Sequence, residues 1–345
     1  MVQGGRKMSK TILIVTDNLP EQVNGVVTTY KNIEACAIRD GFRFVYITPN
    51  EFSYFDCPVY NEVKIAVPWK MGKKIEEICP DYIHIATEGP VGLWARAYLT
   101  KHNHRYNTAY HTKFPEGLKT LIGLPESLTW RYIKWFHKHT GKVLTTTETM
   151  VNQLKDHGLV AVILPWTRGV DRSIFNPSRR YRHSKKHIEL VCVSRVSKEK
   201  NLDDFCKLNY PNSKKTMVGD GPYLNELSQR YPDVNFVGMK KGKELAKYYA
   251  NADVFVFPSK WETFGLVMIE AMACGTPVAA YPEPGPLDVV DVGKTGYLSY
   301  NLHEAIDQSL KLNRYDVYKH SFKWSWDRAW DIFRTNLVET NFKKG

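Results

Sequence analysis

The chain has 345 residues, of which 43% are hydrophobic, 48 are basic and 36 are acidic. This length predicts two domains, the hydrophobic content argues against a disordered chain, and no apolar run approaches the roughly 20 residues of a membrane span. The formal net charge of +12 points to phosphate-bearing ligands, anionic membranes or nucleic acid, without choosing among them.

Short runs of β-branched residues alternate with helical patterns over the first half of the chain. This alternation predicts a doubly wound parallel sheet, because strands buried on both faces read as continuous apolar runs. The predicted strands are 11–18, 42–49, 82–87, 107–112 and 142–147, and the predicted helices are 26–40, 70–79, 90–102, 126–139 and 148–157.

A basic segment at 172–187 follows, with six Lys and Arg residues and no acidic residue, which predicts a solvated linker. The alternation then resumes and predicts a second sheet of the same type. After residue 320 comes a tryptophan-rich amphipathic segment that must pack on a folded domain. The predicted strands of the second sheet are 188–195, 215–220, 234–239, 253–259, 277–282 and 296–300.

Six scattered cysteines form no C-x-x-C pair, which predicts reduced thiols, a cytoplasmic location and no zinc cluster. The N-terminal ten residues contain no apolar segment of a secretory signal. There is also no Asp-x-Asp pair, so we expect no divalent metal and no cofactor. The sequence lacks G-x-S-x-G, P-loop and G-x-G-x-x-G patterns, which argues against serine hydrolases, P-loop nucleotidases and dinucleotide-dependent enzymes.

The most specific local pattern lies at 258–276, directly after a predicted strand. Glu262 lies in the turn and Glu270 follows eight residues later on a predicted helix. Two carboxylates on either side of a helix start are suited to sugar hydroxyls, although a capped helix with exposed glutamates explains the pair equally well. Backbone N–H groups at the helix start are suited to phosphate, and they belong to Phe264, Gly265 and Leu266.

Other candidate residues also follow predicted strands. Arg195 and Lys200 lie in the loop 194–201, where a guanidinium and an ammonium can bind phosphate oxygens, although such a loop is often only solvated surface. Gly219 in GDGP and Gly25 in NGV allow close approach of the backbone to a ligand. His111 ends a predicted strand and can bind a substrate hydroxyl, although a histidine satisfied by the backbone is the more common case.

Together these segments resemble the family-4 retaining glycosyltransferases of GT-B fold, in particular α-mannosyltransferase-like members. The Glu-x7-Glu pair combined with SR…KN is highly specific, whereas each piece alone is not. The loop PWTR at 165–168 departs from the family pattern and leaves details of the acceptor open. The matching segments are NGV at 24–26, IATEGPVG at 85–92, YHTKFPE at 110–116, RGVDRSIFNP at 168–177, SRVSKEKN at 194–201, VGDGP at 218–222 and the run 262–290.

The resemblance implies an α/β protein with two facing Rossmann-like domains and a C-terminal crossover helix. Residues 1–170 would bind the acceptor and 171–320 the nucleotide sugar, and 321–345 would pack back on the N-terminal domain. The catalytic residues would be Arg195 and Lys200 on the diphosphate and Glu262 and His111 on the transferred sugar. Glu270 would bind the ribose, and the other donor-binding residues would be Gly25, Asn201, Gly219, Asp220, Phe264, Gly265 and Leu266.

The implied reaction is transfer of a hexose such as mannose or glucose, with retention, from a GDP- or UDP-sugar to a hydroxyl. The basic charge is concentrated at 96–142 and 172–187, which predicts a polyanionic acceptor or surface. A lipid-linked or glycan acceptor at an anionic membrane, with the enzyme at its inner face, is the first hypothesis. The alternatives are a DNA glycosyltransferase acting on hydroxymethylated bases and, as the weakest, a non-catalytic sugar-nucleotide binding protein.

Overall fold

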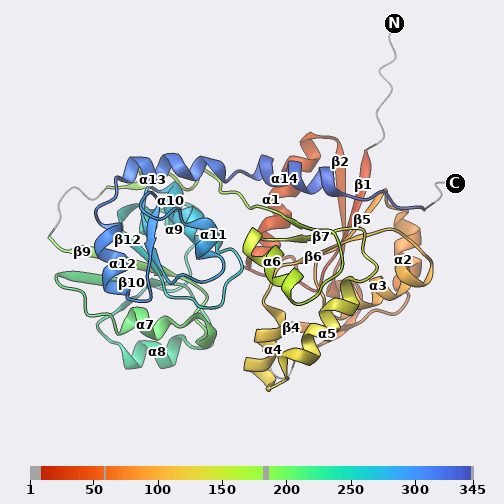
Figure 1. The fold of residues 1–345 in the computed structure, drawn as a ribbon, viewed down its shortest axis with the longest axis horizontal. Coiled ribbons are helices and arrows are strands. Elements are labelled where there is room, and N and C mark those ends of the chain that lie inside the picture. The colour runs from red at the N-terminus through yellow and green to blue at the C-terminus, as the bar shows by residue number, and fades with distance from the viewer. Residues whose placement is uncertain (1–8, 58–59, 182–185, 343–345) are drawn as a thin grey trace, which may run out of the picture. The chain divides into compact units, whose positions relative to one another are not determined.

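The computed structural model describes residues 9–57, 60–181 and 186–342. Its chain forms two compact units (Figure 1). Unit 1 comprises the residues up to Thr167 together with those from Trp326 onward, and unit 2 comprises Arg168–Ser325. The boundaries between the units therefore lie at 167/168 and 325/326. The boundaries expected from the sequence, 170/171 and 320/321, are within a few residues of these.

Unit 1 contains a six-stranded parallel sheet with the order β2-β1-β5-β6-β7-β8. Alternate residues of β1 point to opposite faces, so that Ile12 and Ile14 pack under α1 and α14 while Leu13 and Val15 pack under α2 and α3. The sheet strands are β1 (Lys10–Val15), β2 (Phe42–Ile47), β5 (Tyr82–Ile85), β6 (Asn107–Tyr110), β7 (Val143–Thr145) and β8 (Ile163–Pro165). The helices are α1 (Gly25–Arg39), α2 (Met71–Ile78), α3 (Pro90–Lys101), α4 (Phe114–Ile122), α5 (Glu126–His137), α6 (Glu148–Asp156) and α14 (Trp326–Asn336).

Unit 2 contains a second six-stranded parallel sheet, with the order β11-β10-β9-β12-β13-β14. Helices α9, α10 and α13 cover one face, and α7, α8 and α12 cover the other. The strands are β9 (Ile188–Val193), β10 (Ser213–Val218), β11 (Asn235–Phe236), β12 (Val254–Phe257), β13 (Val278–Ala280) and β14 (Gly296–Leu298). The helices are α7 (Leu202–Cys206), α8 (Leu224–Arg230), α9 (Gly242–Asn251), α10 (Leu266–Ala273), α11 (Pro286–Val289), α12 (Leu302–Ser309) and α13 (Arg314–His320). Two doubly wound parallel sheets confirm the predicted fold class.

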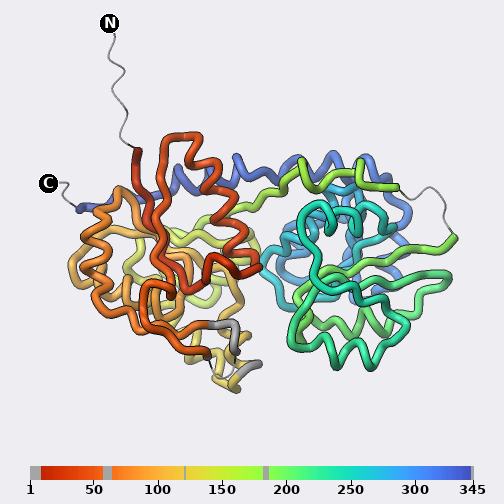
Figure 2. The backbone as a smooth tube through the Cα atoms, turned by 180° about the vertical axis from the view of Figure 1, so that it is seen from behind, coloured from red at the N-terminus to blue at the C-terminus, as the bar shows by residue number. Residues whose placement is uncertain are grey.

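The C-terminal helix α14 lies along α1 in unit 1, and Figure 2 shows the blue C-terminal tube returning to the red and orange elements. Two indole N–H groups fix it: Trp330 donates to Asp40 Oδ2 at 2.7 Å, and Trp166 donates to the carbonyl of Ala329 at 2.8 Å. Beyond the helix, the bridge between Glu339 and Tyr82 continues this attachment.

Three elements of unit 1 escaped the sequence patterns. The antiparallel hairpin of β3 (Ser53–Cys57) and β4 (Tyr60–Val67) lies outside the parallel sheet, β8 is short and ends at a proline, and α4 begins beside Pro115. The prediction of a solvated linker at 172–187 was wrong for the residues that the structure describes, because two arginines there form hydrogen bonds within unit 2. Arg172 donates to the carbonyl of Trp324, and Arg180 donates to that of Ala250; residues 182–185 lie outside the described residues.

Candidate functional site

The predicted site residues all follow the carboxyl ends of strands, the edge at which ligands bind parallel sheets. Gly25 and His111 belong to unit 1, after β1 and β6. The others belong to unit 2 and follow three of its strands: Arg195, Lys200 and Asn201 follow β9, Gly219 and Asp220 follow β10, and Glu262, Phe264, Gly265, Leu266 and Glu270 follow β12, the last two of them in helix α10.

Lys200 joins the β9 loop to the β12 loop. Its Nζ lies 3.1 Å from Glu262 Oε2 and donates a second hydrogen bond, also 3.1 Å long, to the carbonyl of Trp261. Both side chains of the ion pair are about one-fifth exposed, at 20% and 21%. The cation and the carboxylate are therefore held together and still reach solvent.

Opposing influences act on the carboxyl group of Glu262. Burial by itself would raise its pKa. The Lys200 ammonium and two backbone N–H groups, one of them that of Thr263 at 3.0 Å, outweigh burial and hold this pKa below its ordinary value. Glu262 is therefore a carboxylate at neutral pH, which suits it to accept hydrogen bonds from sugar hydroxyls.

Helix α10 begins immediately after this carboxylate with a bare N-terminus. Its N-cap is Gly265 with φ of +83°, a residue that has no side chain with which to cap the first turn, and the first turn contains no acidic residue. Helix α1, by contrast, is capped by Asn24, which accepts from the N–H of Val27. An uncapped helix start without acidic residues has N–H groups and a positive dipole end available to an anion.

Gly285 is a site residue that the motif reading did not single out. It has φ of +91°, and a Cβ there would lie 3.3 Å from Glu262 Cγ and 3.3 Å from the backbone N and O of Phe264. The loop after β13 thus packs directly on the β12 loop. The only sequence signal was the PEPGP segment at 282–286 within the family-like run.

Trp261 is a second residue that the motifs did not single out. Its carbonyl accepts from Lys200, while its indole Nε1 is buried without a hydrogen-bond partner among the described residues. A buried N–H donor without a partner is uncommon and marks a position at which a ligand oxygen would be stabilising.

Glu270 lies on the second turn of α10. Burial raises the pKa of its carboxyl to about 7, although the hydroxyl of Tyr249, which donates to Oε2 at 3.0 Å, lowers it in part. A carboxyl group with a perturbed pKa thus lies on the same helix whose N-terminus is predicted to bind phosphate. Perturbed carboxyl groups of this kind are frequent at functional sites.

The β9 loop carries two further residues predicted for the donor site, Arg195 and Asn201. Burial lowers the pKa of the Arg195 guanidinium, which remains cationic at physiological pH. Asn201 adopts a left-handed conformation with φ of +54°, and its amide donates to Asp204 Oδ2 at 2.6 Å and to the carbonyl of Pro258 at 3.2 Å. Asn201 therefore also fixes the β9 loop against the end of β12.

The two glycines of the GDGP segment are required by contacts within the protein, and not only by the approach of a ligand. A Cβ at Gly219, where φ is +146°, would lie 1.8 Å from the carbonyl oxygen of Ser194, and one at Gly221 would lie 2.4 Å from that of Val196. The β10 loop is thus in backbone contact with the Arg195 loop. Asp220 is exposed, and its Oδ1 accepts from the N–H of Gly221 at 2.7 Å.

In unit 1, Gly25 is the exposed first residue of α1. His111 is buried, with 8% exposure, and its Nε2 lies 3.1 Å from the hydroxyl of Tyr30. Trp166, from the PWTR loop that departs from the family pattern, has its ring centroid 5.6 Å from that of His111. The unusual loop therefore supports the very histidine expected to meet the substrate.

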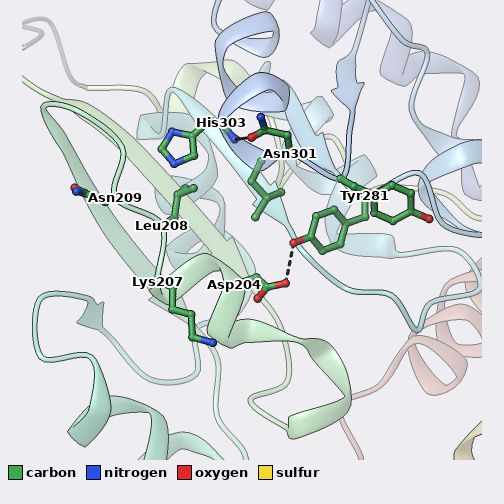
Figure 3. A pocket seen from close by; sticks show the side chains of 9 residues that line it. Asp204, Lys207, Leu208, Asn209, Tyr281, Asn301 and His303 are labelled. Carbon is green, nitrogen blue, oxygen red and sulfur yellow. Dashed lines mark hydrogen bonds between the residues drawn. The ribbon is translucent and has the colours of Figure 1, made fainter.

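A shallow groove of about 580 Å³ lies elsewhere on unit 2 and is lined by none of the predicted residues (Figure 3). The hydroxyl of Tyr281 in this groove donates to Asp204 at 2.8 Å, and Asp204 also accepts from Asn201 of the β9 loop. Asp204 thus links the groove to Asn201 of the β9 loop. Its remaining lining residues are Lys207, Leu208, Asn209, Tyr300, Asn301, Leu302 and His303.

The basic segment 96–142 is only partly a surface feature. Arg96 is buried, and its guanidinium donates to the carbonyls of Phe136 and Trp135. The exposed face of α5 and its C-cap do carry positive charge without ion pairs among the described residues, at Arg131, Lys134 and Lys138. Lys113 is also basic but is nine-tenths buried.

Among the described residues, no group of three or more His, Cys, Asp or Glu side chains could hold a metal ion. No helix in the same part of the chain is long and apolar enough to cross a membrane. Cys36, Cys79, Cys192, Cys206 and Cys274 are free thiols, and Cys57 lies outside that description.

Two family models match the chain in succession. "Glycosyltransferase Family 4" matches residues 23–174, and "Glycosyl transferases group 1" matches residues 175–315. The two matches together contain every predicted site residue.

Curated relatives resemble the chain over most of its length. A GDP-mannose-dependent α-mannosyltransferase of Corynebacterium glutamicum is 28% identical over 95% of this chain and 87% of the relative. The α-monoglucosyldiacylglycerol synthase of Streptococcus pneumoniae is 25% identical over 96% of this chain and 87% of the relative. The sulfoquinovosyl transferase SQD2 of Arabidopsis thaliana is 31% identical over 71% of this chain, and the match spans about half, 52%, of that longer protein.

Solved structures show the same fold. The sucrose-phosphate synthase of Thermosynechococcus elongatus superposes with a TM-score of 0.75, at 18% identity, over 94% of this chain and 98% of that one. Anabaena Alr3699/HepE, solved with UDP and glucose, superposes with a TM-score of 0.70, at 15% identity, over 95% and 98%.

Proposed function

The chain belongs to the family-4 glycosyltransferases of GT-B fold, and from this premise we propose that it transfers a hexose, with retention, from a GDP- or UDP-sugar to a hydroxyl of an anionic lipid-linked or glycan acceptor. Unit 2 binds the nucleotide sugar and unit 1 binds the acceptor. No metal ion takes part, because protein cations and a helix N-terminus meet the diphosphate. Like the acceptor, this last assignment is a proposal.

The observation that carries the proposal is the contact between Lys200 and Glu262. A single ion pair joins a phosphate-binding cation to a carboxylate suited to sugar hydroxyls, next to the bare N-terminus of α10. A nucleotide sugar has phosphate and sugar adjacent to each other in the same way. A partly buried ion pair is seldom needed for stability alone, since apolar side chains of similar volume often stabilise a fold equally well. A role in binding therefore explains this pair better than a role in stability.

The groups of unit 2 suit a loose transition state in which the bond from the sugar carbon to the diphosphate breaks. Negative charge then grows on the leaving phosphate and positive charge on the sugar ring. Arg195 and Lys200 stabilise the phosphate, and the carboxylate of Glu262 binds the sugar hydroxyls. The bond to the acceptor oxygen forms on the same face, and the acceptor proton passes to the departing phosphate.

The hexose and the nucleotide are inferred from relatives. The corynebacterial relative uses GDP-mannose by name, the pneumococcal relative is a glucosyl-lipid synthase, and the Anabaena neighbour was solved with UDP and glucose. GDP-mannose is the donor that we propose first, and UDP-glucose is the second candidate.

Lys113 supports an anionic acceptor. It lies two residues after His111, is 8% exposed, and forms neither an ion pair nor a hydrogen bond through its side chain among the described residues. Burying an ammonium without a partner is costly, so such a lysine is expected where a ligand supplies the negative charge. A phosphate close to the accepting hydroxyl is a group of this kind.

The outer face of α5 supports action at an anionic surface. Leu128 and Trp135 are exposed beside Arg131, Lys134 and Lys138, an arrangement that suits lipid headgroups. The pneumococcal relative has a diacylglycerol lipid in its name. The names of the relatives given above do not refer to DNA. Transfer to a hydroxymethylated base is therefore measured in the test but is not part of the proposal.

The test is a donor panel with the purified chain. GDP- and UDP-hexoses are incubated with anionic phospholipid vesicles containing a hydroxylated lipid acceptor, with a soluble glycan, or with hydroxymethylated DNA, and nucleotide diphosphate release and sugar transfer are measured. We expect transfer from one nucleotide sugar to the lipid or glycan. Transfer to DNA alone would overturn the proposed acceptor, and binding of nucleotide sugar without release or transfer would overturn the proposed enzymatic role.

A further inference from the structure

Asn201 departs from the usual geometry of a helix N-cap. As the N-cap of α7 it has φ of +54° and ψ of +36°, and no described N–H group of the first turn donates to its side chain. An N-cap asparagine ordinarily has an extended backbone and a side-chain oxygen that accepts from that turn. A left-handed backbone is strained for residues other than glycine, so the contacts around Asn201 must impose it.

Two acceptors fix the orientation of the Asn201 amide. Its Nδ2 donates one hydrogen bond of 2.6 Å to Asp204 Oδ2 and another of 3.2 Å to the carbonyl of Pro258, directly after β12. A carboxylate and a backbone carbonyl can only accept, so both require the NH2 side of the amide. The two N–H groups of the side chain are thus used within the protein, where they fasten the β9 loop to the β12 loop.

A third loop holds Asp204 in place. The hydroxyl of Tyr281, directly after β13, donates to the same oxygen, Oδ2, at 2.8 Å, and Figure 3 shows this bond as a dashed line. Tyr281 is 5% exposed, with the Lys260 ammonium 5.4 Å and the Tyr300 ring centroid 5.6 Å from the centroid of its ring. A ring packed in this way keeps its hydroxyl directed at Asp204.

Lys200 directly precedes Asn201 and depends on this arrangement. Its Nζ donates to the carbonyl of Trp261 and to Glu262, both in the β12 loop. Two consecutive residues of the β9 loop therefore bind the same neighbouring loop, one through an ammonium and one through an amide. Rotation of the backbone at Asn201 would change the direction of the chain at Lys200 and move its side chain away from Glu262.

We propose that Asp204 is a positioning residue for Lys200: one of its oxygens accepts from both Tyr281 and Asn201, and so fixes the β9 loop where Lys200 reaches Glu262. The inference rests on the proposed function, in which Lys200 stabilises the leaving diphosphate. A cation stabilises developing charge most when it is held in place beforehand, because nothing then has to reorganise in the transition state. Asp204 and Tyr281 therefore support turnover without touching the donor.

The neighbouring residue of α7 supplies a matched control. Asp203 Oδ2 accepts at 2.8 Å from the hydroxyl of Tyr223, which has the same 5% exposure as Tyr281. Its Oδ1 accepts from Arg230 and from the hydroxyl of Tyr231. These partners belong to α8 and its two caps. The two aspartates thus have similar bonding, and Asp203 is bonded to a helix while its neighbour is bonded to the site loops.

The kinetic arm measures sugar transfer by Asp204→Ala and Tyr281→Phe beside Asp203→Ala and Tyr223→Phe. We expect Asp204→Ala to lower kcat about 10- to 100-fold, comparable to the loss of an outer residue that orients a metal ligand. Tyr281→Phe should lower kcat about 3- to 10-fold, as for one hydrogen bond. The KM of the donor should change less, because Lys200 acts mainly on charge that develops in the transition state. Both control variants should keep the wild-type kcat.

Asp204→Asn separates hydrogen bonding from charge. A single oxygen of Asp204 accepts both hydrogen bonds, so the amide oxygen of an asparagine can take its place and keep them. We expect Asp204→Asn to recover most of the kcat that Asp204→Ala loses. A general effect of negative charge on the site would instead make the two variants equally slow.

Carbon-13 NMR of the glutamate side chains gives a readout that needs no substrate. Burial raises the pKa of Glu262, and the Lys200 ammonium outweighs burial and keeps this pKa below its ordinary value. If Lys200 is displaced in Asp204→Ala, the pKa of Glu262 should rise, whereas loss of a negative charge by itself would lower it. A rise therefore reports displacement of the cation. Asp203→Ala should produce no rise.

Thermal unfolding shows which variants are folded. Should Asp204→Ala not fold, Tyr281→Phe, which keeps the buried ring, is compared with Tyr223→Phe by the same two readouts. An unchanged kcat or an unchanged Glu262 pKa in the folded variant would overturn the inference, and so would equal effects in the control. Failure of the proposed function gives a different pattern, in which the wild type transfers no sugar while NMR still separates the variant from its control.

Discussion

Lys200 Nζ lies 3.1 Å from Glu262 Oε2, and this ion pair joins two loops that are more than 60 residues apart in the sequence. The pair has two consequences. It keeps Glu262 ionised despite its burial, and it holds a cation where the N-terminus of α10 is uncapped. The negative charge of Glu262 therefore depends on the presence of Lys200.

Removing the cation should change the titration of its partner. In Lys200→Ala, burial of Glu262 is no longer outweighed to the same extent, so we expect its pKa to rise relative to the wild type. Carbon-13 NMR of the glutamate side chains over a pH series measures this shift. Lys198→Ala is the matched control, because Lys198 lies in the same loop but pairs with Glu226 on the surface; an equal Glu262 pKa in all three proteins would contradict the account.

Glu270 should make stability depend on pH. Its pKa is raised to about 7, so the folded chain binds this proton more tightly than the unfolded chain does. Stability from this group is therefore fully present below the ordinary glutamate pKa and is lost as pH rises toward about 7. We expect Glu270→Gln to match the wild type near pH 4 and to exceed it at pH 8 by on the order of 1–2 kcal/mol, after allowance for partial exposure.

Thermal unfolding at both pH values measures this difference. Glu244→Gln is the control, since Glu244 is exposed and pairs with Lys240 on the surface of α9, and its effect should not grow with pH. The same Glu270→Gln variant should bind the donor more weakly at pH 8, where the wild-type carboxylate is available to ribose hydroxyls. A stability difference that does not change between pH 4 and pH 8 would contradict the assigned pKa.

Gly219 should tolerate no side chain. In Gly219→Ala the new Cβ would overlap the carbonyl oxygen of Ser194 at 1.8 Å, and we expect a loss of about 3 kcal/mol or more in unfolding free energy. Gly238→Ala also has a positive φ, of +70°, but no atom within 4 Å of the new Cβ, so it should lose only about 1–2 kcal/mol. Equal losses, measured by thermal or denaturant unfolding, would show that the contact between the two loops is not close.

The fold could be read from the sequence because its strands are buried on both faces and appear as continuous apolar runs, such as 12–15 and 254–257. The site loops could be located because they follow those strands. The hairpin of β3 and β4 has no such run, and β8 has three residues. The contact between Tyr30, His84 and His111 depends on strand order, with residues 54 and 81 positions apart, and no local pattern encodes it.

Lys113 also lay beyond sequence reasoning, because only the folded chain shows that it is buried and that its side chain has no ion-pair or hydrogen-bond partner among the described residues. Lys113→Gln should raise the KM for a phosphate-bearing acceptor about tenfold or more, the loss expected for one charge-assisted hydrogen bond. It should leave release of nucleotide diphosphate by donor hydrolysis unchanged. Lys119→Gln, at an exposed lysine paired with Glu126, is the control; an unchanged acceptor KM in Lys113→Gln would contradict the anionic acceptor.

Single-turnover transfer from the donor identified by the panel measures whether Lys200 stabilises the leaving diphosphate of a nucleotide sugar. We predict that Lys200→Ala lowers the rate of sugar transfer by about 10²–10³-fold or more while remaining folded, as for loss of one preorganised group that stabilises developing charge. Lys198→Ala should transfer sugar at the wild-type rate. A wild-type rate in folded Lys200→Ala would contradict the account.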